Sequence, residues 1–243
     1  MKFNTTLLSK NTGKTKLALV LLGAALISLN SCKTDVPEPE IISALAITNA
    51  SSSTPSVDFV IEGTKVNGTP LLFGQKVDYV RAYPGSRTGE VYATGVAKSL
   101  YSAKFDLTAG FYHSLYILSS GPATDGTQLS YLLVKDEYKS PVADKAQIRF
   151  ANLSSDAPSL DLELQGDTTT FSDRAYKALT PYKYVKPAIF KVLLKNKGTN
   201  TIVASLDNIE LKANKYYTIW AKGSYNTDVV AQRISIQLSE HFN

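Results

Sequence analysis

The 243-residue sequence is poor in the residues that most often carry chemistry, with one cysteine and two histidines. A single cysteine, Cys32, excludes an intramolecular disulfide, and two histidines cannot supply the three or four ligands of a zinc site. The sequence also has no Gly-x-Gly-x-x-Gly segment or phosphate-binding loop. We therefore expect no metal, no nucleotide and no other cofactor.

Long apolar runs are equally scarce. A helix needs about 20 apolar residues to cross a bilayer, and nothing after residue 31 approaches that length. The earlier run, Leu17–Leu29, is shorter, follows a lysine-bearing start and precedes the polar pair before Cys32. Residues 1–31 therefore have the pattern of a cleaved signal peptide.

The residues around Cys32 suggest how the mature protein is attached to a membrane. The segment Leu29-Asn30-Ser31-Cys32 resembles the lipobox of bacterial lipoproteins, although Asn30 departs from the usual small residue. Residues 32–42 are acidic and contain prolines, which suits an extended tether. Acidic residues soon after an acylated cysteine resemble signals that send some lipoproteins to the cell surface. We expect lipidation of Cys32 and a lipid-anchored protein at the outer membrane or cell surface.

A basic surface stripe for nucleic acid is also missing. The formal charge of +5 includes Lys2, Lys10, Lys14 and Lys16 of the signal peptide, and without these four lysines it falls to +1. The arginines are scattered along the chain rather than clustered, as phosphate binding would require. Nucleic acid is therefore excluded as a partner.

What the sequence does contain is an internal duplication. The offset between the copies stays between 103 and 105 residues. The matching segments are 49–58 with 152–161, Tyr79-Val80 with Tyr184-Val185, Pro84-Gly85 with Pro187-Ala188, and 107–116 with 211–220. We infer a first repeat at 43–137, a linker at 138–145 and a second repeat at 146–243.

Each repeat has the periodicity of β-strands. Val57, Phe59 and Ile61 alternate with other side chains, and turn formers such as Asn67-Gly68 separate the runs. No amphipathic segment of helical length occurs. The sequence therefore predicts an all-β protein with two tandem immunoglobulin-like β-sandwich domains and almost no helix.

The repeated motif resembles the bacterial domain of unknown function 4397. The resemblance is carried by Asn-x-Ser-Ser-x-x-Pro-Ser-[Val/Leu]-Asp, by Tyr-Val before a Pro-Gly or Pro-Ala turn, and by a late Leu-x-Ala-[Gly/Asn]-x-Tyr strand. It covers nearly the whole mature chain, twice. The resemblance implies an exported, often lipidated, repeated β-domain, for which no activity or catalytic residue is established.

Candidate catalytic residues are few. His113 corresponds to Tyr217 in the second repeat, which favours a packing or surface role, and His241 lies near the chain end, where we expect fraying. Asp58 and Asp161 occupy equivalent places, which favours a repeated structural task such as binding backbone amides. Calcium at Asp156, Asp161 and Glu163 is an alternative that lacks a known loop spacing. We expect no enzymatic activity.

One candidate binding surface follows from the late strand of each repeat. Residues two apart share a strand face, so Tyr112 and Tyr116 form one aromatic stripe, and Tyr216 and Trp220 form the other. Ser114 and Thr218 lie between them. The stripes either contact a glycan or protein partner, or form the inward face of each sandwich while Leu115 and its neighbours point outward. Because the opposite face is equally apolar, the alternation favours the inward alternative.

The sequence therefore favours a non-enzymatic binding or adhesion module of the cell envelope, with an envelope protein or glycan as partner. The alternative is a structural or assembly subunit of an envelope complex. A hydrolase that uses carboxylates is disfavoured, because neither repeat has a constellation that the other lacks.

The lipidation of Cys32 can be tested directly. The Cys32→Ser variant should appear in a soluble fraction or stay unprocessed, because the acyl acceptor is gone. Fractionation of cells expressing each form would measure this. Unchanged membrane partitioning of the variant would contradict a lipid anchor at Cys32.

Overall fold

The computed structural model describes residues 41–119, 128–199 and 201–242. The signal peptide, Cys32 and most of the expected tether lie outside these residues. Chain contacts separate Met1–Glu40 from a compact unit, Ile41–Asn243. In this described part, no helix is long and apolar enough to cross a membrane.

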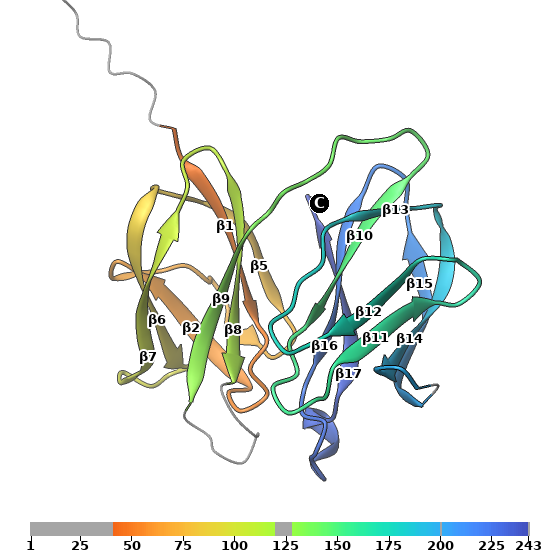
Figure 1. Ribbon diagram of the computed structural model, residues 1–243. Helices are drawn as coiled ribbons and strands as arrows, with labels where there is room; N and C mark the ends of the chain where they lie inside the picture. Colours follow the sequence, from red (N-terminus) through yellow and green to blue (C-terminus); the bar gives the residue numbers. More distant parts are fainter. Residues whose placement is uncertain (1–40, 120–127, 200, 243) are drawn as a thin grey trace, which may run out of the picture. The chain divides into compact units, whose positions relative to one another are not determined.

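The compact unit is built from β-strands, which confirms the predicted all-β class (Figure 1). The strands of its first half are β1 (Ser43–Asn49), β2 (Ser56–Ile61), β3 (Thr64–Lys65), β4 (Leu71–Leu72), β5 (Lys76–Ala82), β6 (Gly85–Ala93), β7 (Ser99–Leu107), β8 (Tyr112–Ser119) and β9 (Leu129–Lys135). The elements of its second half are β10 (Ala146–Asn152), β11 (Leu160–Leu164), β12 (Thr170–Arg174), β13 (Lys183–Val185), β14 (Ala188–Asn196), β15 (Ile202–Leu211), β16 (Tyr216–Lys222), the 3-10 turn η2 (Val230–Gln232) and β17 (Ser235–His241).

The two halves have the same strand order. One sheet has the order β5-β1-β8-β9 in the first half and β13-β10-β16-β17 in the second. The facing sheet has the order β3-β2-β6-β7, with β4 beside β2, and its counterpart is β12-β11-β14-β15. In both halves the first strand runs parallel to the late aromatic strand, with Ala44 opposite Tyr112 and Gln147 opposite Tyr216. The sequence duplication thus corresponds to a repeated topology.

Each half has its own apolar core between its two sheets. In the first half Leu45 and Ile47 of β1 pack with Val57 and Phe59 of β2. The second half repeats this with Ile148 and other residues of β10 against the leucines of β11. The alternation that predicted half-buried strands is therefore the packing pattern of each sandwich. Each fully buried large aliphatic side chain contributes about 1.5–3 kcal/mol.

The repeated Asn-x-Ser motif ends the first strand of each half. The Asn49 side-chain oxygen accepts the Ser51 backbone N–H at 3.1 Å, and Asn152 accepts the Ser154 N–H at the same distance. The Asn49 amide also donates to the Thr54 carbonyl at 3.0 Å. Asparagine is suited to this because its side chain can bond to the backbone two residues later. The motif is therefore a buried turn that redirects the chain from one sheet to the other.

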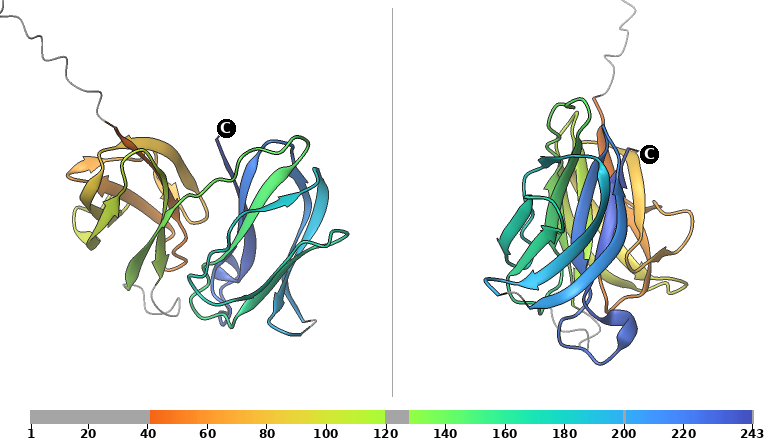
Figure 2. Two further views of the ribbon diagram at one scale, coloured as in Figure 1. Left: turned by 45° about the horizontal axis from the view of Figure 1, so that its top comes forward. Right: turned by 90° about the vertical axis from the view of Figure 1, so that its right-hand side faces the viewer.

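A third apolar cluster joins the two halves. It contains residues of both, including Tyr116 and Leu118 of β8 and Trp220 of β16. The sheets that contain β8 and β16 consequently pack against each other, and these two strands are buried on both faces over most of their length (Figure 1). The start of β1 and the end of β17 lie at one end of the unit, and the segment that contains η2 lies at the opposite end (Figure 2).

Independent folding of the two repeats stays a prediction. Fragments 43–137 and 146–243 should each show β-sheet circular dichroism and a cooperative melt, because each half has its own core and turns. Both should melt below the intact protein, because each loses the shared cluster. Random-coil spectra from both fragments would mean that the halves fold only together.

Candidate functional site

The two aromatic stripes predicted from the sequence meet at the junction of the halves. Trp220 is fully buried and its ring centroid lies 6.4 Å from that of Tyr116, which is also buried. Tyr112, at the end of the stripe, keeps 41% of its surface exposed, and Tyr216 is half-buried. Tyr116 and Trp220 therefore contact each other across the junction, whereas Tyr112 and Tyr216 each contact the ring of Phe242, with centroids 4.9 Å and 6.0 Å away.

This placement corrects the inward-face interpretation. The residues packed inside the first sandwich are Leu115 and Ile117, which the sequence analysis placed outward, and His113 is also buried. Tyr116, between them, faces the second half. The alternation was correctly identified but the faces were exchanged, because an apolar pattern on both faces does not tell which one has the sandwich partner.

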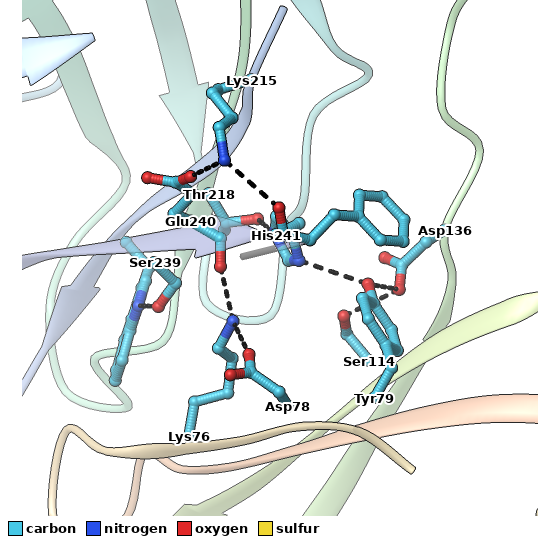
Figure 3. A network of polar contacts seen from close by, with 12 residues as sticks. Lys76, Asp78, Tyr79, Ser114, Asp136, Lys215, Thr218, Ser239, Glu240 and His241 are labelled. Carbon is cyan, nitrogen blue, oxygen red and sulfur yellow. Dashed lines mark hydrogen bonds and ion pairs between the residues drawn. The ribbon is translucent and has the colours of Figure 1, made fainter. Parts of the chain in front are cut away.

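Beside this apolar contact lies a buried polar network, which we call the interhalf network; Figure 3 shows its part around Tyr79, Asp136 and His241. Its centre is an ion pair between Arg149 of β10 and Asp136, which follows β9, with Nη2 and Oδ1 2.7 Å apart. Both side chains are almost fully buried. Asp136 Oδ2 accepts hydrogen bonds from the hydroxyls of Tyr79 and Ser114, each at 2.8 Å. Arg149 Nε donates to Thr218 Oγ1 at 2.8 Å.

His241 completes the network from the second half. Its Nε2 lies 2.8 Å from Thr218 Oγ1, and its Nδ1 lies 3.2 Å from the Tyr79 hydroxyl (Figure 3). His241 is 2% exposed, so the expectation of a frayed chain end was wrong. A position near the chain end predicted fraying, but strand β17 stays paired with β16 up to His241, which lies opposite Tyr216.

The network combines equivalent positions of the two repeats. Asp136 directly follows β9 and His241 is the last residue of β17, so both lie at the end of the strand that pairs with the late aromatic strand. Each contacts the hydroxyl of Ser114 or Thr218 in its own half. Across the junction they share the Tyr79 hydroxyl. The duplicated scaffold therefore aligns an acid in one half with a base in the other.

Burial controls protonation in the network. Burial, together with the smaller effect of the positive charges of Arg149 and Lys76, lowers the pKa of His241 to about 2. Burial raises the pKa of Tyr79, and the charge of Asp136 adds to this. His241 and Tyr79 are thus neutral at physiological pH, and the ion pair holds the network's charge.

Other candidate residues from the sequence have structural partners. Asp161 accepts the backbone N–H groups of Asp173 at 2.7 Å and Gly198 at 3.1 Å, as expected for a structural task. Asp58 forms an ion pair with Lys65 at 2.8 Å, which lowers the pKa of Asp58.

His113 and Tyr217 also share one role. His113 Nε2 accepts the Thr108 backbone N–H at 3.3 Å, and the Tyr217 hydroxyl accepts that of Lys212 at 3.1 Å. Burial lowers the pKa of His113. The two side chains therefore hold the equivalent turn before the late strand of each half, which matches the packing role predicted for His113.

The proposed calcium ligands do not converge. Asp156 accepts hydrogen bonds from the Ser224 hydroxyl at 2.6 Å and the Tyr225 N–H at 2.7 Å, whereas Asp161 bonds elsewhere. Although burial raises it, these hydrogen bonds leave the pKa of Asp156 lowered overall. Glu163 pairs with Lys195 at 2.6 Å. Within residues 41–119, 128–199 and 201–242, no three His, Cys, Asp or Glu side chains gather as a metal site.

The first half also contains an open cleft of about 450 Å³ at one end of its sandwich. Its walls include Ile61, Val66 and Val80. Its rim carries Tyr83, which is 61% exposed, and Arg81, which is also exposed. We call this the Tyr83 cleft. It lies within the 300–1,000 Å³ typical of small-ligand pockets, and the sequence analysis missed it because its residues come from separate strands.

A second hollow, of about 430 Å³, lies beside the interhalf network. Arg149 and Tyr182 form part of its lining, with the guanidinium 4.8 Å from the centroid of the Tyr182 ring. Lys135 and Glu137 are also among the lining residues and form an ion pair, with Lys135 Nζ 3.7 Å from Glu137 Oε1. Its main charges thus already have partners inside the protein.

Comparisons with known proteins support the family resemblance. The model of DUF4397, a domain of unknown function, matches residues 43–163, which span the first half and the start of the second. No curated protein matches the chain.

Two solved structures illustrate the remote likeness to other proteins. A CBM26 module from Eubacterium rectale in complex with maltoheptaose is 13% identical, with a TM-score of 0.27, over 82% of this chain and 97% of that one. The tip fimbrial protein Mfa3 from Porphyromonas gingivalis is 10% identical, with a TM-score of 0.24, over 82% of this chain and 99% of that one. At these scores, neither carries an argument about the present chain.

Replacing the tryptophan at the junction should destabilise the protein. Trp220→Ala should lower the free energy of unfolding by ~3–5 kcal/mol, because it leaves a cavity in the shared cluster. Chemical denaturation would measure this, with Tyr83→Ala as the control for an exposed aromatic. A Trp220→Ala protein as stable as the control would contradict the buried junction.

The buried His241 makes stability depend on pH. Its folded pKa of about 2 lies below the ordinary 6.5, so the unfolded chain takes up a proton first and stability falls as pH drops below about 6.5. At ~1.4 kcal/mol per pH unit, the loss from this residue between pH 7 and pH 5 is about 2 kcal/mol.

His241→Gln isolates this contribution, because the amide can still reach Thr218 but does not titrate. The stability difference between the native protein and the variant should shrink by that amount on going from pH 7 to pH 5. Denaturation curves at both pH values supply the measurement. A difference that does not vary with pH would show that His241 titrates normally in the folded state.

Proposed function

We propose that the protein is a non-enzymatic binding or adhesion module of the bacterial cell envelope, anchored by a lipid on Cys32. In this proposal the Tyr83 cleft is the ligand site. The observation that carries it is the combination, in one open cleft, of an exposed aromatic ring, apolar walls and one arginine, Arg81, that is unpaired among the described residues.

The chemistry of the remaining side chains supports binding rather than catalysis. The carboxylates of Asp136, Asp156 and Asp161 each accept hydrogen bonds that stabilise the fold. In the Tyr83 cleft the acidic lining residue, Glu62, accepts the Thr88 backbone N–H. A carboxylate that holds a turn in this way is poorly placed to act as an acid or base.

A structural or assembly role in an envelope complex is the second candidate. The observation that favours it is the loop around η2, where Val229 is 54% and Val230 is 74% exposed. The loop is fastened by the Asp156 carboxylate, which accepts the Tyr225 and Asn226 backbone N–H groups.

The two candidates differ in which substitution weakens envelope binding. The full chain carrying Cys32→Ser, which cannot be acylated, should be retained on isolated envelope polysaccharide or outer-membrane protein. Tyr83→Ala should reduce this retention about tenfold or more, because an exposed aromatic that becomes buried in a complex contributes strongly to affinity. Tyr184→Ala, an exposed tyrosine in the second half, is the matched control.

Each result has a definite meaning. Retention that depends on Tyr83 supports the binding module, and the fraction that retains the protein identifies the partner class. Retention lost in a Val229→Ser and Val230→Ser double variant, but unaffected by Tyr83→Ala, would transfer the function to the η2 loop. No retention on either fraction would contradict both candidates.

A further inference from the structure

The Tyr83 cleft is specific to the first half, although the topology is repeated. The position equivalent to Arg87 is Phe190, because Phe59 pairs with Val91 in β2–β6 and Leu162 with Leu194 in β11–β14, each 103 residues apart. Phe190 is 7% exposed and belongs to the core of the second half. A phenylalanine thus fills, in one half, the space that opens as a cleft in the other.

Arg87 keeps the cleft open by turning toward its own hairpin. Its Nε donates to the Tyr83 carbonyl at 3.0 Å, and Nη2 donates to the Pro84 carbonyl. The guanidinium lies 6.0 Å from the centroid of the Tyr83 ring. These contacts hold the arginine at the mouth, and the aliphatic walls behind it remain partly exposed.

The charges at the mouth are mainly positive. Lys65, Arg81 and Arg87 line the cleft with one acid, Glu62. Among the described residues, no hydrogen bond or ion pair engages the Arg81 guanidinium, whereas Lys65 is paired with Asp58. Arginine can bind a carboxylate through two parallel hydrogen bonds. Arg81 is therefore the group most available to an incoming anion.

We propose that the Tyr83 cleft binds a carboxylate attached to an apolar body, with the apolar part between Ile61, Val66 and Val80 and the carboxylate at Arg81. The aliphatic walls require the apolar part, and the unpaired guanidinium requires the charge. This inference rests on the proposed binding function and names its ligand chemistry. A fatty-acyl chain and an apolar residue at a peptide carboxyl terminus both present this chemistry.

Matched small probes test the two requirements separately. Octanoate has both the tail and the charge, acetate has only the charge, and octylammonium has the tail with the opposite charge. Each would be titrated into the full chain carrying Cys32→Ser and followed by NMR at the resonances of Val66 and Val80. Octanoate should bind at least about tenfold more tightly than either of the others, the equivalent of about 1.4 kcal/mol.

Two variants link binding to the cleft. Arg87→Phe introduces the residue of the second half and should abolish octanoate binding by filling the space. Arg81→Gln, at an exposed position that should leave the fold intact, should weaken octanoate binding about 5- to 10-fold and leave octylammonium unchanged. Arg174→Gln, an arginine on β12 of the second half, is the matched control and should have no effect.

Further measurements distinguish a peptide ligand from a lipid, and failure of this inference from failure of the proposed binding function. N-acetyl-leucine binding more tightly than octanoate would indicate a peptide terminus, and the reverse order a lipid. Equal binding of octanoate and octylammonium would overturn the charge requirement. Trigalacturonate is a sugar trimer that carries carboxylates but no apolar tail, so its binding as tightly as octanoate would overturn the apolar requirement. Envelope retention that depends on Tyr83 without octanoate binding would reject this inference and leave the binding module standing. Octanoate binding without envelope retention would support the ligand chemistry inferred here and reject the envelope-binding module.

Discussion

The interhalf network around Arg149 and Asp136 is the constraint on which the arrangement of the two halves depends. Removing either partner while the other stays buried would cost several kcal/mol, and separating the halves would break this ion pair and expose the apolar cluster beside it. Tyr79, Thr218 and His241 satisfy further polar atoms around this pair. The apolar contact of Trp220 with Tyr116 covers the adjoining surface. The two sandwiches thus pack against each other as one compact unit.

The duplication explains both the similarity of the halves and their differences. Equivalent strands, turns and hydrogen bonds recur, down to the Asn49 and Asn152 turns. The junction uses the same strand face from each copy, but with an acid at Asp136 and a base at His241. The ends of the sandwiches have diverged further, since Arg87 leaves a cleft where Phe190 closes the core. One scaffold has therefore supplied a contact surface and, in one copy, an open pocket.

The family match leaves function to the site itself, because a fold alone does not define an activity. Asp161 and His113 act as structural hydrogen-bond acceptors, whereas Arg81 at the mouth of the Tyr83 cleft has no partner among the described residues. This division of labour favours a protein that holds a ligand in a fixed geometry. Rigid strands on both sides of the cleft suit that task, since little ordering is needed on binding.

The sequence by itself determined the all-β class, the repeat offset and the structural roles of Asp161 and His113, because these follow from local periodicity and from comparing the two copies. It also located the aromatic stripes of Tyr112, Tyr116, Tyr216 and Trp220. Only the tertiary structure decided that these stripes meet each other, that His241 is buried, and that Arg87 borders a cleft. Those outcomes depend on which sheets pack together, and a period of two is the same whichever face is covered. The difference between Arg87 and Phe190 was present in the aligned repeats, but its meaning required the space between the sheets.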